Sequence, residues 1–314
     1  MRKLHATVRR VTRLACLALS LATPAFAADE ARIVLTFGAF GDTPYNEEEE
    51  ARFPDLIAEL NREELAFAIH VGDFKSAASV CTDELYLERR RWFGLSHHPF
   101  VFLAGDNDWL DCNRALLDGR DPRERLQKLR VIFFDSGKGL GQAPLTAVRQ
   151  SDVSPNHAYP EHLRWLDRGV LFITLNVPGP NNNSRDAAER DPRSKAISAW
   201  LDDSFRIARA GGLRAIVVFM HASAWNSAGK PRRAFRPLLA QLARETRQFG
   251  RPVLLVHGDE HQYRVDQPLR NDESNEPISN FTRVEVFGSP DMNWVRIRII
   301  EEAGRIRWEV RPGS

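Results

Sequence analysis

Apolar residues gather in six runs of strand length that are rich in β-branched and aromatic side chains. The runs are RIVLTFGAF (32–40), LAFAIHV (65–71), PFVFLA (99–104), VLFITLNV (170–177), LRAIVVFM (213–220) and PVLLVH (252–257). Because they lack the alternation of a strand with one solvated face, they predict strands that are buried on both faces.

Between several of these runs, apolar residues recur every three or four positions, which predicts amphipathic helices. Asn46 followed by the acidic residues 47–50 is typical of a solvated helix start, and Gly250 suits a helix end. Strands that alternate with helices indicate an α/β fold in which helices cover the sheet layers. The three helical sets are Phe53, Leu56, Ile57 and Leu60; Ile197, Trp200, Leu201 and Phe205; and Phe235, Leu238, Leu239 and Leu242.

The pattern changes from Gln262 onward. The stretches TRVEVFG, NWVRIRII and RIRWEV alternate apolar and polar residues, which predicts antiparallel strands with one solvated face. No repeat, low-complexity tract or linker divides the sequence, so we expect residues 28–314 to form a single domain.

The first 27 residues follow a separate pattern, in which five basic residues lead into the apolar run LACLALSLA and the segment TPAFA. This pattern predicts a signal peptide at residues 1–27 and a periplasmic or secreted product, because the run is too short to span a bilayer. No other segment is long and apolar enough to span one. Cleavage would change the formal net charge from +2 to −3, since it removes five basic and no acidic residues. No basic stripe with interleaved aromatic residues predicts nucleic-acid binding.

Two cysteines, Cys81 and Cys112, lie outside the predicted signal peptide. In an oxidising compartment such a pair is more often bridged than free, so we predict a disulfide, with two free thiols as the alternative. Each cysteine follows a Gly-Asp turn by a few residues, so a bridge would tie the two following loops together.

Nearly every predicted core strand ends on a polar residue that can bind a ligand. Since ligands bind beyond the carboxyl ends of the strands in open α/β sheets, these residues are expected to converge on one crevice. A single Gly-Asp turn would be an ordinary structural feature, and the repetition is what indicates a site. The residues are Asp42, Asp73, Asp106 to Asp108, Asn176, His221 and the segment HGDEH at 257–261.

Several carboxylates in one crevice repel each other and have raised pKa values unless a cation neutralises them. A shell of Asp, Asn and His side chains suits divalent manganese, zinc or iron, and the lack of a thiolate cluster argues against a structural zinc site. The residues therefore predict a metal centre with two divalent transition-metal ions that share one bridging aspartate.

The order of these motifs resembles that of the calcineurin-like metallophosphoesterases, which include the purple acid phosphatases. Their pattern is D-x-H or a GD variant, then GD, then G-N-H-[DE], then a lone His after a strand, then G-H-x-H. The corresponding stretches are GDTPY (41–45), GDFKS (72–76), GDNDW (105–109), VVFMH (217–221) and HGDEH (257–261). The resemblance covers most of residues 28–314 and implies a metallophosphatase-like layered β-sandwich flanked by helices.

The resemblance also implies roles for individual residues. Asp42 and His261 would bind the first ion, His221 would bind the second, and Asp73 would bridge both. Asp259 replaces the first His of G-H-x-H and can bind an ion through oxygen.

Further departures from the family pattern lie at Pro44 and in the segment GDND. His257 is an outside candidate as a ligand near the last motif. Pro44 stands where the first motif would have a His, and the neighbouring Tyr45 either supplies a phenolate oxygen or is a plain turn residue.

The segment GDND admits two alignments with G-N-H-D. Position by position, Asp106 is the ligand and Asn107 takes the place of the catalytic His. Shifted by one, Asn107 is the amide ligand and Asp108 takes that place. We favour the shift, because it retains an asparagine ligand and supplies a carboxyl group that can protonate a leaving alkoxide.

These residues predict metal-dependent hydrolysis of a small phosphorylated substrate by a metal-activated water. Lys75 and Asn176 are candidates for substrate binding, against the alternatives of a surface lysine and a turn residue. Trp109 is expected either to wall the cleft or to pack in the core. The second hypothesis is an exported binding or envelope protein that has kept the scaffold and lost turnover. A serine hydrolase is a poor third, since no G-x-S-x-G motif is present.

Overall fold

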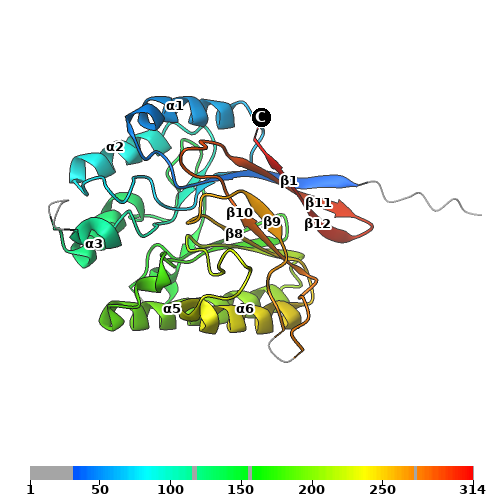
Figure 1. Cartoon of the computed structure of the whole chain (residues 1–314). Coiled ribbons are helices and arrows are strands. Elements are labelled where there is room, and N and C mark those ends of the chain that lie inside the picture. The colour runs from blue at the N-terminus through cyan, green and yellow to red at the C-terminus, as the bar shows by residue number, and fades with distance from the viewer. Residues whose placement is uncertain (1–30, 115–118, 155–157, 272–273, 314) are drawn as a thin grey trace, which may run out of the picture.

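Two β-sheets pack face to face at the centre of the molecule (Figure 1). The computed structural model describes residues 31–114, 119–154, 158–271 and 274–313, so the predicted signal peptide lies outside the described residues. The first sheet has five strands in the order β12-β11-β1-β2-β3. The second has seven strands in the order β4-β5-β6-β7-β8-β10-β9.

Both sheets combine parallel and antiparallel strands. The strands of the first sheet are β1 (Arg32–Phe40), β2 (Ala68–His70), β3 (Phe100–Phe102), β11 (Val295–Glu302) and β12 (Arg305–Pro312). Those of the second are β4 (Val148–Arg149), β5 (Leu163–Asp167), β6 (Val170–Thr174), β7 (Ala215–Phe219), β8 (Val253–His257), β9 (Arg264–Asp266) and β10 (Phe281–Glu285).

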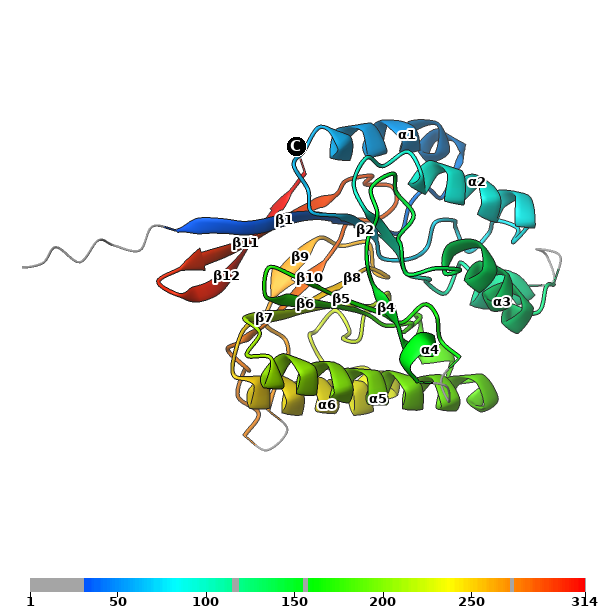
Figure 2. The same cartoon turned by 180° about the vertical axis from the view of Figure 1, so that it is seen from behind.

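Helices cover the outer face of each sheet, as the two opposite views show (Figures 1 and 2). The first sheet is covered by α1 (Glu47–Asn61), α2 (Asp83–Phe93) and α3 (Pro122–Phe133), and the second by α5 (Ala187–Ala210) and α6 (Arg236–Phe249). Among the described residues, shorter elements are α4 (Gln150–Val153) and 3₁₀ turns at Leu110–Asn113, Asn181–Asn183 and Arg233–Phe235. Across the described ranges, no helix combines the length and the apolar character needed to cross a membrane.

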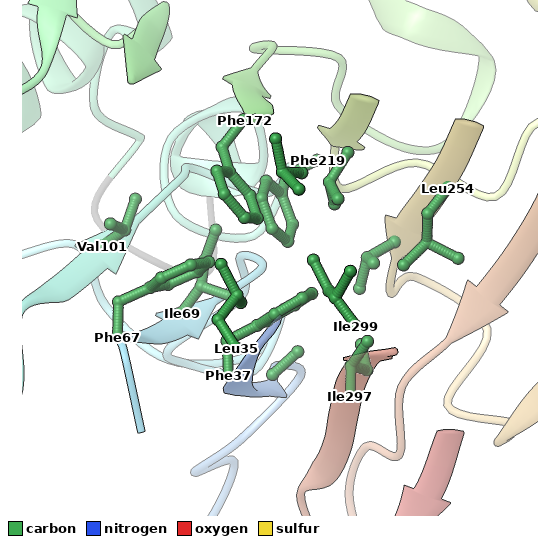
Figure 3. Close-up of a cluster of buried hydrophobic side chains, with 14 of the residues drawn as sticks. Leu35, Phe37, Phe67, Ile69, Val101, Phe172, Phe219, Leu254, Ile297 and Ile299 are labelled. Atoms are coloured by element: carbon green, nitrogen blue, oxygen red, sulfur yellow. The ribbon is translucent and has the colours of Figure 1, made fainter. Parts of the chain in front are cut away.

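Aliphatic and aromatic side chains fill the space between the sheets (Figure 3). Phe67 stacks on Phe37 with ring centroids 4.9 Å apart, and its ring meets Phe172 of the second sheet edge to face at 5.1 Å. These contacts join the two layers through residues of the predicted apolar runs.

The predicted elements are largely confirmed. Each of the six apolar runs contains a core strand, and the three helical sets fall in α1, α5 and α6, except that Phe235 lies in the 3₁₀ turn just before α6. Asn46 caps α1 by accepting a hydrogen bond from the Glu49 backbone N–H at 3.0 Å, and Gly250 ends α6 with a left-handed backbone, φ 67°.

The prediction for β10 was wrong in part. This strand pairs parallel with β8 and antiparallel only with β9, and Arg283 within it is fully buried. The guanidinium lies over the Trp225 ring, 5.0 Å from its centroid, and forms an ion pair with Asp266. A charge that the alternating pattern assigned to a solvated face is thus neutralised inside the protein.

Parallel pairing brings the carboxyl ends of the core strands to a common edge. In the first sheet β1, β2 and β3 are parallel, and in the second β6, β7 and β8 are parallel. The loops from the two sheets also meet, because the His221 ring nitrogen Nδ1 lies 2.9 Å from the Val71 carbonyl oxygen. The polar residues predicted at the strand ends therefore share one region.

Candidate metal centre

Candidate ligands from both sheets converge beyond the strand ends. His221, after β7, places its Nε2 atom 3.1 Å from Asp106 Oδ1 and 3.4 Å from Asp73 Oδ2. The same nitrogen lies 3.9 Å from Asp259 Oδ1. His261 Nε2 lies 3.5 Å from Asp42 Oδ1. The predicted convergence of residues far apart in sequence is therefore present.

Two overlapping groups have the geometry of metal ligands. Asp42, Asp73 and His221 form one, and Asp106, His221 and Asp259 form the other, with the ligand atoms of each group within 4.8 Å of one another. Three of these residues have a strained backbone: the φ angles of Asp42, Asp73 and Asp259 are 52°, 59° and 84°. Left-handed backbone at non-glycine residues is uncommon and gathers at functional sites.

Hydrogen bonds to the backbone orient both histidines. His221 Nδ1 donates to Val71 O at 2.9 Å, and His261 Nδ1 donates to Ser289 O at 2.8 Å, since a carbonyl can only accept. The Nε2 lone pair of each ring is therefore directed at the carboxylates. A histidine that binds a metal is held in this way, by a hydrogen bond from its other ring nitrogen.

Glycines allow the carboxylates to approach the backbone closely. A Cβ atom at Gly105 would lie 2.0 Å from Asp73 Oδ1, and one at Gly258 would lie 2.2 Å from Asp42 Oδ2. No side chain fits at such distances, so these Gly-Asp turns require glycine to hold the carboxylates in place.

The electrostatics of the cluster call for a cation. Burial raises the pKa of Asp73 and of Asp259 to about 6, and raises that of Asp42 well above its usual value. Burial alone would lower the pKa of His221, but the Asp73 and Asp106 carboxylates raise it well above its usual value. The raised pKa values mean that the metal-free cluster binds protons. A divalent ion would supply the same positive charge, and the carboxylate oxygens and imidazole nitrogens of the cluster are ligands that suit such an ion.

Tyr45 lies inside this cluster, where the sequence left its role open. Its hydroxyl is 3.1 Å from Asp73 Oδ2, 3.3 Å from His261 Nε2 and 3.5 Å from Asp42 Oδ1. The Asn107 side-chain amide donates a hydrogen bond to it at 3.1 Å. The hydroxyl is therefore placed within reach of the atoms that were predicted to hold the first ion.

Glu49 supports Tyr45, and sequence reasoning missed it. Its carboxylate is buried, accepts from the Tyr45 backbone N–H at 2.7 Å and accepts from Ser289 Oγ at 2.5 Å. The acidic run 47–50 was read as a solvated helix start, and for Glu49 that reading was wrong. Its position one helical turn after Asn46 could have indicated that it points back toward the preceding loop.

Asp108 does not face the cluster, so its predicted role as a proton donor is corrected. Oδ2 accepts from the backbone N–H groups of Asp73 at 2.8 Å and Gly105 at 2.7 Å, and Oδ1 accepts from that of Phe74 at 2.9 Å. A buried carboxylate with three backbone donors joins the loops after β2 and β3. It acts as a positioning residue.

The structure favours the alignment that we had ranked second for GDND. Asp106 lies in the ligand group with His221 and Asp259, whereas the Asn107 amide donates to Tyr45. Asn107 therefore occupies the place of the family's catalytic His. Our preference for Asn107 as the ligand is corrected.

The structure places the two predicted substrate-binding residues in the interior. Lys75 is buried, and its ammonium donates to the carbonyls of Ser76 at 3.1 Å and Ser79 at 3.0 Å. Asn176 is buried as well, with its amide donating to Glu161 at 3.0 Å. Lys75 organises its own loop, and Asn176 joins the loop after β6 to Glu161.

Three further candidates can now be placed. His257 is fully buried, its Nδ1 lies 2.8 Å from the Gly258 carbonyl, and burial lowers its pKa to about 3, so it lies outside both ligand groups. Trp109 is buried in the core under the first sheet's helices and also borders a pocket. Cys81 and Cys112 form the predicted disulfide, with their Cα atoms 5.7 Å apart.

A pocket of about 540 Å³ opens beside Asp106. Parts of segments 109–114 and 121–123 form one side, and residues from 179–186 form the other. Gly179 brings the second side against the cluster, because a Cβ atom there would lie 2.2 Å from Asp259 Oδ1. A larger cavity of about 750 Å³ between α5 and α6 is lined by none of the candidate ligands.

Comparison with known proteins agrees with this architecture. No protein-family model and no curated protein matches the sequence. A dimetal phosphatase from Danio rerio superposes with a TM-score of 0.50 at 10% identity, covering 90% of this chain and 100% of its own. PhoD superposes with a TM-score of 0.52 at 10% identity, covering 92% of this chain and 73% of its own.

Purple acid phosphatase PPD1 from yellow lupin (Lupinus luteus) seeds gives a TM-score of 0.51 at 12% identity, covering 91% of this chain and 52% of its own. Similarity at such low identity concerns the fold alone. The chain therefore has the metallophosphatase-like fold, two mixed sheets flanked by helices, that the order of its motifs predicted.

Proposed function

We propose that this protein is a metal-dependent phosphoesterase that hydrolyses a small phosphorylated substrate. One observation carries the proposal: His221 Nε2 and Asp106 Oδ1 are buried, lie 3.1 Å apart, and have no hydrogen-bond partner among the described residues. Buried polar atoms without partners are rare in folded proteins. A divalent cation would satisfy both atoms together with Asp259.

The metal would supply the chemistry that no side chain here offers, since a divalent ion acts as a Lewis acid that lowers the pKa of water and polarises phosphoryl oxygens. The protein would orient the reaction. Asp73 is central to that task, because Oδ2 faces both His221 and Tyr45 while Oδ1 accepts from the Asn107 backbone N–H at 3.0 Å. Its carboxylate is therefore fixed between His221 and Tyr45.

The residues near the cluster also favour a class of substrate. Asn107 can orient a phosphoryl oxygen through its amide, but an amide cannot protonate a leaving alkoxide. Asp108 is held by three backbone N–H groups. We therefore expect faster hydrolysis of aryl esters, whose leaving groups are stable as anions, than of alkyl esters.

The pocket beside Asp106 is the proposed site for the organic part of the substrate. Its rim is polar, with an Arg114–Asp111 ion pair at 2.7 Å and an Arg123–Asp186 ion pair at 2.7 Å. Such a lining suits a polar or charged group better than a lipid chain.

The test is reconstitution of activity. Protein stripped with a chelator is assayed with added manganese, zinc or iron on an aryl phosphate monoester, an aryl diester and an alkyl monoester. We expect activity only with metal, and loss of about 100- to 1,000-fold in Asp73→Asn, by analogy with the removal of other preorganised electrostatic groups. Asp55→Asn, an exposed carboxylate on α1, is the matched control and should keep wild-type activity. Full activity in Asp73→Asn would contradict the proposal.

A binding protein without turnover is the second candidate, and Asn107 favours it because it replaces the family's catalytic His. That protein would take up metal and retain phosphate, yet hydrolyse none of the three esters. Calorimetric titration of the metal-loaded chain with inorganic phosphate separates this outcome from an inactive, empty protein.

Export is proposed as well. The disulfide supports it, since disulfides persist mainly in oxidising compartments. Fractionation of cells that produce the full chain, with mass determination of the N-terminus, tests cleavage near Ala27. Accumulation of uncleaved protein in the reducing cytosol would contradict it.

A further inference from the structure

The candidate centre has two halves that differ in how their ligand atoms are satisfied. We call Asp106, His221 and Asp259 the His221 half, and Asp42, Tyr45 and His261 the His261 half. Asp73 lies between them, with Oδ2 at 3.4 Å from His221 Nε2 and 3.1 Å from the Tyr45 hydroxyl.

In the His221 half, Asp259 Oδ2 accepts from the Ser223 backbone N–H at 2.8 Å, but the atoms that face one another have no donor from the surrounding protein. His221 Nδ1 donates to Val71 O, so the Nε2 lone pair faces Asp106 Oδ1 and Asp259 Oδ1. His221 is fully buried, and its Nε2 atom and Asp106 Oδ1 have no hydrogen-bond partner among the described residues. When Nε2 is unprotonated, as it must be to bind a metal, three acceptors converge with no donor between them and leave a place for a cation.

In the His261 half, protein groups donate to the ligand atoms: the Asp259 backbone N–H donates to Asp42, and the single Tyr45 hydroxyl proton is shared among neighbouring acceptors. Both Asp42 oxygens accept from the Asp259 backbone N–H, at 3.1 and 3.2 Å. The Tyr45 hydroxyl lies among Asp42, Asp73 and His261 and accepts from the Asn107 amide. Among the described residues, no buried ligand atom of this half is left without a partner.

Tyr45 is also held firmly in this position. Its backbone N–H donates to Glu49 at 2.7 Å, and its ring meets His261 edge to face with centroids 5.2 Å apart. Glu49 is itself fixed, because Ser289 Oγ donates to it at 2.5 Å and it lies in the first turn of α1. A cation entering this half would have to displace a hydroxyl with several partners and a rigid support.

We infer that the centre binds one divalent cation tightly, in the His221 half, and that the Tyr45 hydroxyl takes the place of a second ion in the His261 half. The inference rests on the proposed metal-dependent function. It replaces the two ions expected from the sequence by one ion and one hydrogen-bonded phenol. A second cation would also be repelled by the first across the shared Asp73 carboxylate.

The decisive measurement is metal stoichiometry. Chelator-treated full chain is titrated with Mn²⁺ or Zn²⁺ in a calorimeter, and the metal content per chain is determined after removal of free ions. We expect one ion per chain, and Mn²⁺-loaded protein should give the electron paramagnetic resonance signal of an isolated ion. Two ions of similar affinity, with the signal of a coupled pair, would overturn the inference.

Two matched histidine variants locate the ion. His221→Ala should weaken binding of the single ion by about 100-fold or more, since even supporting residues of metal ligands contribute 10- to 100-fold. His261→Ala should change that affinity by less than about threefold. Equal losses in the two variants would contradict a centre based on the His221 half. If His221→Ala fails to fold, as judged by circular dichroism, Asp259→Asn is the substitute, because Asp259 is only partly buried.

Tyr45→Phe tests the role of the hydroxyl. Removal of this one oxygen leaves Asp42, Asp73 and His261 facing an empty position, so we expect the variant to take up a second ion. If it still takes up one, Tyr45 is not what excludes the second ion, and that part of the inference fails.

The outcomes separate this inference from the proposed function. Two ions in the wild-type protein would contradict the inference alone, because a phosphoesterase with two ions would remain possible. No ion at all, in protein that circular dichroism shows to be folded, would contradict both. One ion in the wild-type protein, lost in His221→Ala and kept in His261→Ala, would support both.

Discussion

Between the two sheets, Phe37, Phe67 and Phe172 are removed from solvent among other apolar side chains. At the strand ends, Asp42 and His221 are removed from solvent as completely. Burial of apolar area in the first region stabilises the fold, whereas burial of charge in the second opposes it unless a partner compensates. Equal burial thus has opposite energetic consequences in the two regions, and the polar region has a role other than stability.

The largest expected effect concerns the apolar region. Phe67→Ala removes a ring that contacts Phe37, Trp165 and Phe172, at centroid distances of 4.9, 5.2 and 5.1 Å. We expect the free energy of unfolding to fall by about 3–5 kcal/mol, with and without metal. Urea unfolding measures this change. Leu166→Ala is the control, since Leu166 is exposed on β5 and should change stability by less than about 0.5 kcal/mol. A loss below about 1 kcal/mol for Phe67→Ala would show that packing between the two sheets at Phe67 contributes little to stability.

The disulfide joins the two regions. Cys81 and Cys112, 31 residues apart in sequence, pack in the core under the helices of the first sheet, while the loops that they tie together begin at Asp73 and Asp106. The double variant Cys81→Ala/Cys112→Ala should lower the free energy of unfolding by about 3 kcal/mol. Metal affinity should fall as well, because the ligand loops gain freedom. Unchanged metal affinity would show that Asp108 and its backbone bonds hold these loops without the bridge.

In the polar region, removal of a charge should stabilise the metal-free protein. Burial raises the pKa of Asp259 to about 6, so the folded state retains this proton to a higher pH than the unfolded chain does. Its contribution to stability is therefore present below about pH 4 and is lost as the pH rises through 6. Asp259→Asn does not titrate and keeps an acceptor for the Ser223 N–H.

Without metal, we expect Asp259→Asn to be about 1–3 kcal/mol more stable than the wild-type protein at pH 7, with a smaller difference toward pH 4. Urea unfolding in the presence of a chelator, at several pH values, measures it. Addition of a divalent ion should reverse the order at pH 7, because the wild-type protein binds it more tightly. A metal-free variant that is less stable than the wild-type protein at pH 7 would contradict the view of Asp259 as a destabilising buried charge.

Local patterns were sufficient to predict most of the fold. The apolar runs and the Gly-Asp turns after β1, β2 and β3 depend on neighbouring residues only, and parallel pairing then brings the strand ends together. The alternating pattern around Arg283 predicted that this side chain lies on a solvated face, and that prediction was wrong. The side chain is buried because its charge is neutralised by Asp266, a residue of a neighbouring strand. A partner distant in sequence is not visible in the pattern.

The candidate site shows the same division. Asp42, Asp73 and His221 could be found from their positions at strand ends, whereas the roles of Asp108 and Lys75 could not. Both lie on the same loops as the ligands, and only the course of the backbone decides that Asp108 accepts three N–H groups and that Lys75 donates to two carbonyls. Residue type and spacing predict which side chains reach a site, but not which of them turn back to the backbone.

The smallest expected effect concerns the exposed side of the pocket beside Asp106. A polar side chain there should affect substrate binding but have little effect on the free energy of unfolding. Asn181 is exposed and has a left-handed backbone, with φ 60°. Asn181→Gly keeps this conformation and removes the amide, so we expect KM for the best ester substrate to rise about 2- to 10-fold, as for one lost hydrogen bond, with kcat unchanged.

Asn181→Ala separates the backbone from the side chain. It should raise KM to the same extent and should also lower the free energy of unfolding by about 1–2 kcal/mol, because alanine is strained in the left-handed region. Steady-state kinetics and urea unfolding of the two variants measure both effects. If KM is unchanged in both, the organic part of the substrate does not bind between Asp106 and the 179–186 segment. Asn181 also borders the larger cavity between α5 and α6. The same result would therefore show that Asn181 does not contact a substrate bound in that cavity.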